Sequence, residues 1–330
     1  MQITESVPGI HVIRLPLPFE LNHVNVALVR LESGYLLIDT GFDTEESFRA
    51  LSEAMATLGV GWSDIRKILV THMHPDHIGM LARLRALTGA EVSMHRAEVE
   101  HLNEMVDAGV APWLSEGLKR AGSPHSMVVA IHHSIKGLRD SLHRVTPDVT
   151  LDGGEEFATA LGTARIVWTP GHTVGHVCVY WPEVGAFYSG DHMIEKITPN
   201  ISWLPDRDCL AEYIASLEML VPFEIDTVIP SHGQAFRGHA AWVLKTVAHH
   251  QERCGLLARA LEAGPKTAHH LVPALWDRHL SPFHYHFALF EVLAHLEFMR
   301  RSGTVHAELT SEGVAEWSVH SPLSVLPAQV

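Results

Sequence analysis

Residues 70–79, VTHMHPDHIG, place three histidines and an aspartate within six positions, directly after the apolar run IRKILV. Burying so many titratable groups costs free energy unless they bind something. Histidine and aspartate side chains are common ligands of transition metals. The stretch therefore predicts a fold in which a buried strand ends at a metal site.

The spacing within HMHPDH indicates positions for two ions. His72 and His74 are two residues apart, so on an extended segment both side chains point to the same side. Pro75 turns the chain, and Asp76 and His77 then project toward a second position.

The same pattern, a strand that runs into a loop with a histidine or aspartate, recurs three times. TARIVWTPGH leads into His172, GAFYSGDH into Asp191 and DTVIPSHG into His232. Loops at one edge of a sheet commonly bring side chains together. The set exceeds the roughly three protein ligands of a catalytic zinc. We therefore predict two divalent ions, with zinc favoured and manganese, iron or cobalt as alternatives.

Hydrophobic periodicity predicts stacked α/β layers for residues 1–238. Residues 9–41 read as strands, residues 44–59 as a helix capped by Thr44, residues 78–90 as a second helix, and residues 149–230 as a strand-rich block. Residues 96–148 read as helices without a strand. This insertion is either a lid or substrate wall, or a packing elaboration.

Residues 239–330 predict a separate module. Three helices, the last with Ser281 as N-cap, Pro282 at its first position and Gly303 after its end, precede a predicted hairpin. This order suggests a small winged-helix-like domain. We favour a dimerisation or lid role for it, which makes a homodimer an expected assembly.

Composition excludes several classes of protein. The formal net charge is −14, which opposes a large non-specific grip on nucleic acid. No apolar run approaches the roughly 20 residues of a membrane-spanning helix. The first residues lack a secretion-signal pattern, and Cys178, Cys209 and Cys254 form no CxxC pair. We expect a cytoplasmic globular protein without membrane partners.

Four motifs carry a resemblance to a known family. THMHPDH, DGG…TPGHTVGH, SGDH and IPSHG, in this order and preceded by LLIDTG, resemble the metallo-β-lactamase superfamily over about residues 8–238. The resemblance implies an αββα sandwich with a binuclear site at one edge of the two sheets. GHTVGH with SGDH is most similar to the glyoxalase II, lactonase and general hydrolase branch. The C-terminal module resembles the winged-helix tail of lactamase-beta-like endoribonucleases.

The resemblance also assigns roles to individual residues. It implies that the first ion is bound by His72, His74 and His172, the second by Asp76, His77 and His232, and both by the bridging Asp191. Asp39 matches a buried aspartate that orients a ligand imidazole, and His176 is expected behind the ligands. A histidine at position 74 differs from the glutamate of flavodiiron oxygen reductases, which argues against a redox role.

The predicted reaction is hydrolysis by a hydroxide that bridges two metals, because the ions lower the pKa of water to about 7. Asp76 and Asp191 are the predicted catalytic residues: both hold the hydroxide, and Asp76 relays a proton. We expect a small-molecule ester, lactone or thioester as substrate, with Tyr188 and His192 as candidate contacts. The alternative is a phosphodiesterase or endoribonuclease whose C-terminal module binds RNA.

Overall fold

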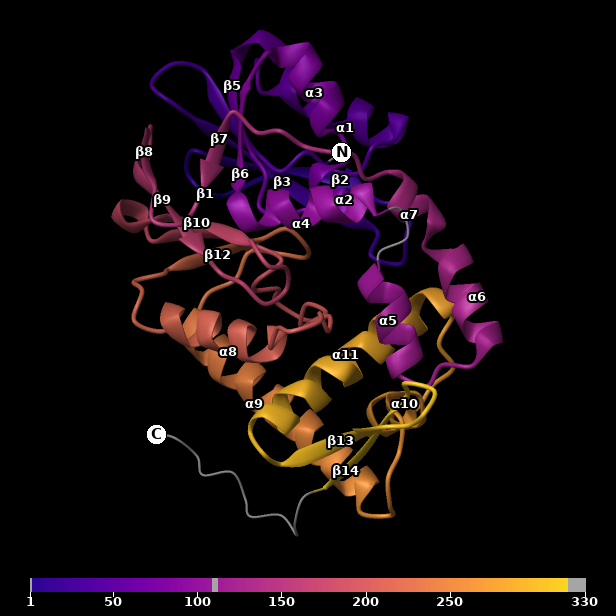
Figure 1. Cartoon of the computed structure of the whole chain (residues 1–330). Helices are drawn as coiled ribbons and strands as arrows, with labels where there is room; N and C mark the ends of the chain where they lie inside the picture. The colour runs from indigo at the N-terminus through magenta and orange to yellow at the C-terminus, as the bar shows by residue number, and fades with distance from the viewer. Residues whose placement is uncertain (1, 109–111, 320–330) are drawn as a thin grey trace. The chain divides into compact units, whose positions relative to one another are not determined.

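The computed structural model describes residues 2–108 and 112–319 (Figure 1). The chain divides into two compact units. Unit 1 comprises Met1–Gly109, Leu138–Pro199 and Tyr213–Leu244. Unit 2 comprises Val110–Gly137, Asn200–Glu212 and Lys245–Val330. Helix α9 (His239–Leu261) has residues in both units. A domain boundary at residue 238 stays a prediction.

Unit 1 contains two sheets. The first has the order β1-β2-β3-β4-β5-β6-β7, antiparallel from β1 to β4 and parallel from β4 to β7. Its strands are β1 (Gln2–Val7), β2 (Ile10–Pro16), β3 (His23–Arg30), β4 (Tyr35–Ile38), β5 (Ile65–Leu69), β6 (Glu91–His95) and β7 (Val149–Leu151).

The second sheet has the order β12-β11-β10-β9-β8, in which only the β11–β12 pair is parallel. Its strands are β8 (Glu156–Thr159), β9 (Gly162–Trp168), β10 (Val177–Trp181), β11 (Ala186–Gly190) and β12 (Thr227–Pro230). Buried side chains of both sheets form one shared core, which includes Ile10 and Val12 of β2 and Val177 and Val179 of β10.

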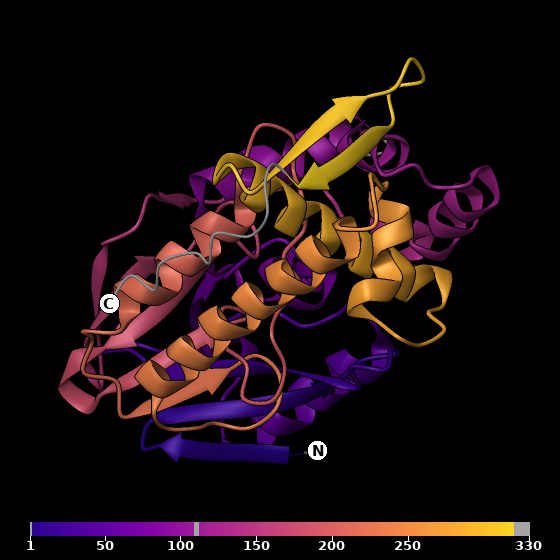
Figure 2. The same cartoon turned by 90° about the horizontal axis from the view of Figure 1, so that it is seen from below.

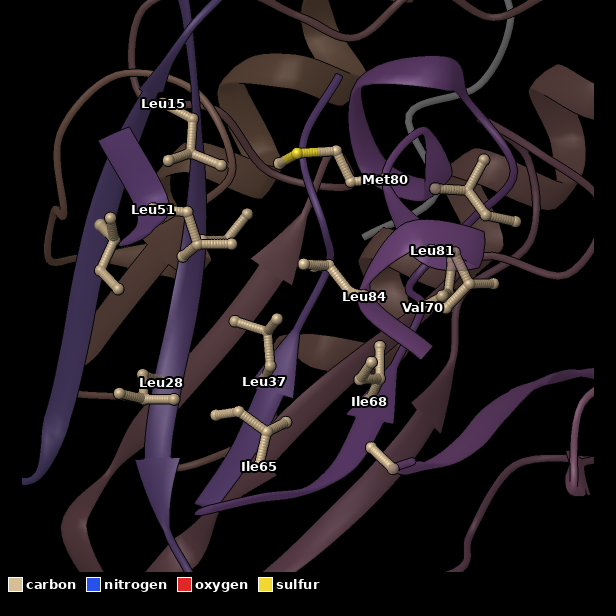
Figure 3. Close-up of a cluster of buried hydrophobic side chains, with 14 of the residues drawn as sticks. Leu15, Leu28, Leu37, Leu51, Ile65, Ile68, Val70, Met80, Leu81 and Leu84 are labelled. Atoms are coloured by element: carbon tan, nitrogen blue, oxygen red, sulfur yellow. The ribbon is translucent and has the colours of Figure 1, made fainter. Parts of the chain in front are cut away.

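Alternation along the strands separates this core from a second one on the outer face of the first sheet. Ile13 and Leu15, which alternate with the inward residues of β2, pack there with residues of helices α1 (Glu45–Thr57) and α3 (Leu81–Thr88). Figure 3 shows Leu51 of α1 and Leu84 of α3 in this cluster. The two sheets with helices over their faces form the mixed α/β sandwich that the motifs predict.

Local signals predict the helices of unit 1 well, apart from the start of one helix. The predicted cap of α1 is confirmed, since the Thr44 side chain accepts from the backbone N–H of Ser47. The helix predicted over residues 78–90 is present as α3 (Leu81–Thr88), but it begins three residues later than predicted, because Ile78 ends the separate short helix α2 (Pro75–Ile78). The N–H of Met80 donates to the carbonyl of Gly41 at 3.1 Å and leaves the helical pattern.

The segment 96–148 contributes helices to both units. Helix α4 (Arg96–Asp107) belongs to unit 1, and α5 (Pro112–Arg120) and α6 (His125–Ser134) belong to unit 2. Helix α7 (Lys136–Asp140) crosses the division. A role of the segment as lid or wall stays a prediction.

Unit 2 has the elements predicted for the C-terminal module. They are the end of α9, α10 (Ala268–Leu275), α11 (Pro282–Arg301) and the hairpin β13 (Val305–Leu309)–β14 (Ala315–Val319), drawn in yellow in Figure 2. Ser281 caps α11 as predicted. The winged-helix comparison stays a prediction, and its last residues, 320–330, lie outside the described part. Helix α8 (Cys209–Leu220) crosses from unit 2 into unit 1.

Across residues 2–108 and 112–319, none of the helices combines the length and the apolarity that a membrane crossing requires.

Candidate metal centre

Four strand ends of unit 1 bring the ligand-type side chains together. His72 lies three residues after the end of β5, and His74 follows it. Asp76 and His77 lie in the short helix α2. His172 follows β9, Asp191 follows β11 and His232 follows β12. All of these residues except His74 and Asp76 are buried.

The first group consists of His72, His74, His172 and Asp191, whose ligand atoms lie within 4.8 Å of one another. His74 Nδ1 is 3.0 Å from His72 Nε2 and 3.1 Å from His172 Nε2. Nitrogens that share one tetrahedral zinc at 2.0–2.1 Å lie about 3.3 Å apart. The spacing of these nitrogens is close to what a single ion requires.

The second group consists of Asp76, His77 and His232. Asp76 Oδ2 is 3.3 Å from His232 Nε2 and 3.6 Å from His77 Nε2. The two groups therefore present separate clusters of nitrogen and oxygen atoms.

Asp191 faces both groups with different oxygens. Its Oδ2 is 3.6 Å from His172 Nε2 and 3.9 Å from His72 Nε2. Its Oδ1 is 3.3 Å from His232 Nε2 and 3.5 Å from His77 Nε2. This is the arrangement that a carboxylate needs in order to bridge two cations.

Hydrogen bonds behind the clusters fix the tautomers of three histidines. His77 Nδ1 donates to Asp39 Oδ2 at 2.9 Å, and His232 Nδ1 donates to the carbonyl of His23 at 2.8 Å. The Thr71 hydroxyl donates to Asp39, so its oxygen accepts from His72 Nδ1 at 3.1 Å. In each neutral ring, Nε2 is left without a proton and with its lone pair directed at the cluster.

Asp39 is held in an unusual backbone conformation. Its φ is +63°, in the left-handed region that non-glycine residues rarely occupy. The residue is fully buried, and its carboxylate also accepts from the backbone N–H of Thr71 at 2.8 Å. Strain of this kind persists where the surroundings determine the conformation, as they do here.

His176 lies behind Asp191. Its Nε2 accepts from the backbone N–H of Asp191 at 3.1 Å, and its Nδ1 donates to the Thr169 hydroxyl at 2.9 Å. Both ring nitrogens are therefore used inside the protein, and the ring holds the Asp191 backbone in place.

Tyr188 and His192 are fully buried. The Tyr188 hydroxyl donates to the carbonyl of Asn25 at 2.8 Å and lies 3.5 Å from Asp39 Oδ2. The His192 ring packs edge-on against Tyr213, and burial, followed by the charge of His172, lowers its pKa to about 3. Their contact with substrate stays a prediction, and Tyr188 takes a position that supports Asp39.

The charges of the centre divide the histidines into two kinds. Burial, followed by the charge of the nearby His172, lowers the pKa of His74 to about 3. Burial also opposes the charge of His232, but Asp191 and Asp76 raise its pKa to about 10. Burial works against ionisation of Asp76, yet His77 and His232 hold its pKa at about 2. The carboxylates thus stay anionic and attract a cation, which in the metal-free protein is a proton.

Buried atoms without hydrogen bonds show that the residues fit metal ions. His77 Nε2, His232 Nε2 and Asp191 Oδ1 are all buried and lack a hydrogen bond of adequate geometry. A buried polar atom in this state costs about 1–3 kcal/mol. Asp191 Oδ1 lies 3.5 Å from His77 Nε2 and 3.3 Å from His232 Nε2, so one cation among the three atoms would satisfy them.

Another set of ligand-type groups lies in unit 2. His250 of α9 and Glu291 and His295 of α11 each offer one atom within a 4.8 Å set. Glu291 is paired with Arg253 and accepts from the Asn200 amide at 3.2 Å. Because Arg253 already neutralises the carboxylate, we interpret this set as a polar packing network.

Two contributors to the centre were missed by sequence reasoning. Thr71 relays the contact between Asp39 and His72, and its place directly before His72 was the available signal. His23 contributes its main-chain carbonyl, a group that every residue has, so the sequence gives no signal for it.

Comparisons with known proteins agree with the architecture. The profile of the metallo-beta-lactamase superfamily matches residues 20–232, and that of the metallo-beta-lactamase-like C-terminal domain matches residues 254–320. Among solved structures, a metallo-beta-lactamase family protein from Thermus thermophilus is 28% identical with a TM-score of 0.83, covering 95% of this chain and 99% of that one. A beta-lactamase domain protein from Burkholderia ambifaria is 27% identical with a TM-score of 0.86, covering 96% and 94%.

Relatives whose names state an activity are less similar to this chain. A probable metallo-hydrolase of Bacillus subtilis (strain 168) is 25% identical over 287 residues, which are 81% of this chain and 86% of that protein. An acyl-coenzyme A thioesterase of Bos taurus is 25% identical over 229 residues, which are 65% of this chain and 75% of that protein.

Proposed function

The chain belongs to the metallo-β-lactamase superfamily and is a metal-dependent hydrolase, and on that premise we propose a binuclear centre that cleaves carboxylic esters, lactones or thioesters. The observation that carries the proposal is Asp191, whose two oxygens face two separate groups of ligand-type atoms. A carboxylate placed in this way can serve two cations, one in each group.

We assign the ligands by group. His72, His74 and His172 would hold the first ion, Asp76, His77 and His232 would hold the second, and Asp191 would contribute to both. The donors are imidazole nitrogens and carboxylate oxygens without a thiolate, a set that suits zinc and also manganese, iron or cobalt. Asp39 and His176 hold ligands in place through their hydrogen bonds.

Two bound divalent ions would supply a hydroxide nucleophile at neutral pH and polarise the oxygen of the scissile group. The protein's own side chains would orient the reacting groups and move protons. Asp191 and Asp76 are the anionic groups beside the two clusters. The Asp76 side chain is 20% exposed and that of Asp191 10%, so Asp76 is the better placed to pass a proton to the leaving group.

Two observations favour an acyl substrate. The chain is similar to acyl-coenzyme A thioesterases of Bos taurus and Homo sapiens, which cleave thioesters as their names state. The formal charge of −14 disfavours a long polyanion such as RNA, whose binding depends on clustered positive side chains.

The test is hydrolysis by metal-reconstituted protein of an aryl ester, a lactone, an acyl thioester, a phosphodiester and a structured RNA. His74→Ala removes one ligand, and His143→Ala, at an exposed histidine, is the matched control. We expect acyl turnover that falls at least about 100-fold in His74→Ala and is unchanged in the control, since even substitutions behind the ligands cost 10–100-fold. Turnover of RNA that declines steeply with salt would overturn the acyl assignment.

A further inference from the structure

Glu98 is a fully buried carboxylate near the start of α4. Its Oε1 accepts from the backbone N–H of Met73 at 2.8 Å, and its Oε2 accepts from the backbone N–H of Gly175 at 2.7 Å. Burying an ionised carboxylate is costly unless such bonds compensate for the loss of water.

The two donors belong to the two loops that supply the first group. Met73 stands between His72 and His74, and Gly175 stands between His172 and His176. These loops are about one hundred residues apart in sequence, so nothing in the local sequence of either loop requires that one side chain support both. One side chain thus sets the distance between them, using one oxygen for each loop.

The close approach of α4 to the second loop is an independent observation. A Cβ at position 175 would lie 2.5 Å from the backbone nitrogen of Glu98, so only glycine fits there. Directly before α4, the ring of His95 stacks on Trp168, with 5.1 Å between centroids and 13° between planes. The Trp168 indole donates to the carbonyl of Val174 at 3.2 Å. The β6–α4 junction therefore contacts this loop directly through Glu98, and its His95 supports the loop indirectly through Trp168.

We propose that Glu98 is a positioning residue of the metal centre, which fixes the nitrogens of His72, His74 and His172 at the spacing of a single ion. The inference rests on the binuclear centre proposed above. It also gives the first helix of the 96–148 segment a role in metal binding, distinct from a lid and from plain packing.

The experiment measures metal binding directly in three variants. Glu98→Gln keeps the side-chain size, but its NH2 group faces the N–H of either Met73 or Gly175, so one loop loses its support. Leu102→Ala is the matched control, because Leu102 is fully buried one turn further along α4 and touches neither loop through a hydrogen bond. Gly175→Ala keeps the carboxylate and pushes the loop away from it. Zinc affinity is measured by competition with a chelator, and ligand geometry by the visible spectrum of the cobalt-substituted protein.

We expect Glu98→Gln and Gly175→Ala to lower zinc affinity about 10–100-fold and to alter the cobalt spectrum. Leu102→Ala should lower thermal stability while leaving both metal readouts unchanged. The inference is wrong if Glu98→Gln binds as the wild type does, or if Leu102→Ala loses affinity to the same degree. Hydrogen exchange on the wild type adds a check that needs no variant, since fast exchange of the Met73 or Gly175 amide also overturns it.

Failure of the proposed centre has a different signature. In that case the wild type binds fewer than two ions, or His74→Ala binds as many as the wild type, and the inference about Glu98 falls with it. If the His74→Ala variant loses ions and the Glu98→Gln variant does not, only the role of Glu98 is refuted.

Discussion

Replacing Asp39 by asparagine separates the charge of this residue from its backbone. Asparagine tolerates the φ of +63°, so the exchange adds little backbone strain. The amide has one acceptor, whereas the carboxylate accepts from Thr71 and from His77. With its oxygen toward Thr71, the new NH2 group meets His77 Nδ1, and the imidazole must move its proton to Nε2, the atom that faces Asp76 and Asp191.

The size of the effect follows from these contacts. A hydrogen bond to a charged acceptor contributes about 1.5–3 kcal/mol and a neutral one about 0.5–1.5 kcal/mol. Two such bonds become neutral, so the metal-free protein should lose about 2–3 kcal/mol of unfolding free energy. Zinc affinity should fall about 10–100-fold, because the wrong nitrogen of His77 then carries the proton.

Urea denaturation of the metal-free protein and a competitive zinc titration measure the two quantities. Tyr188→Phe is the control, since it removes the 3.5 Å contact with Asp39 and the bond to Asn25 while leaving the carboxylate intact. It should cost about 1 kcal/mol of stability and little zinc affinity. An Asp39→Asn protein that binds two zinc ions as tightly as the wild type would refute the assignment of the His77 tautomer.

Three further predictions concern stability. Gly79→Ala should lower the unfolding free energy by about 3 kcal/mol in urea denaturation, because its Cβ would lie 2.4 Å from the carbonyl oxygen of Pro75. The control Gly89→Ala, at φ +65° with open space around the new Cβ, should lower it by about 1 kcal/mol. Equal losses would contradict the steric argument. Burial, then His132, lowers the pKa of His286 to about 4 from 6.5, so the contribution of this residue to stability is complete above pH 6.5 and falls by about 3 kcal/mol as the pH drops to 4. In urea denaturation, His286→Leu should make the loss of stability between pH 6.5 and pH 4 smaller by this amount, and an unchanged pH dependence counts against the reasoning. Arg253→Met should cost about 3–5 kcal/mol by leaving Glu291 buried without its cation, and adding Glu291→Met should restore most of that loss; a single variant as stable as wild type would show that the pair is not coupled.

Predictions from sequence succeeded where local chemistry decides the structure. Thr44 and Ser281 cap their helices through bonds to residues three positions away, so the information lies within one turn. The meeting of His72, His172 and His232 also followed from local patterns, because each stands just after a strand and strand ends of one sandwich share an edge.

Features that depend on distant partners were missed. The break after Ile78 follows from the carbonyl of Gly41, some forty residues away, which takes the N–H of Met80. In the sequence AEVEH, Glu98 and Glu100 look equivalent, yet the first is fully buried and the second is exposed. Only the position of the loops at Met73 and Gly175 distinguishes them.

The proposed centre draws its ligand-type side chains from both sheets. His72 to His77 follow a strand of the first sheet, and His172, Asp191 and His232 follow strands of the second. A cation held there ties the two layers together, so its binding free energy is added to the free energy of packing one sheet on the other. Substitutions in the shared core, such as at the fully buried Trp181, should therefore weaken metal retention without touching a ligand. Metal content then reports how well the two sheets are packed against each other.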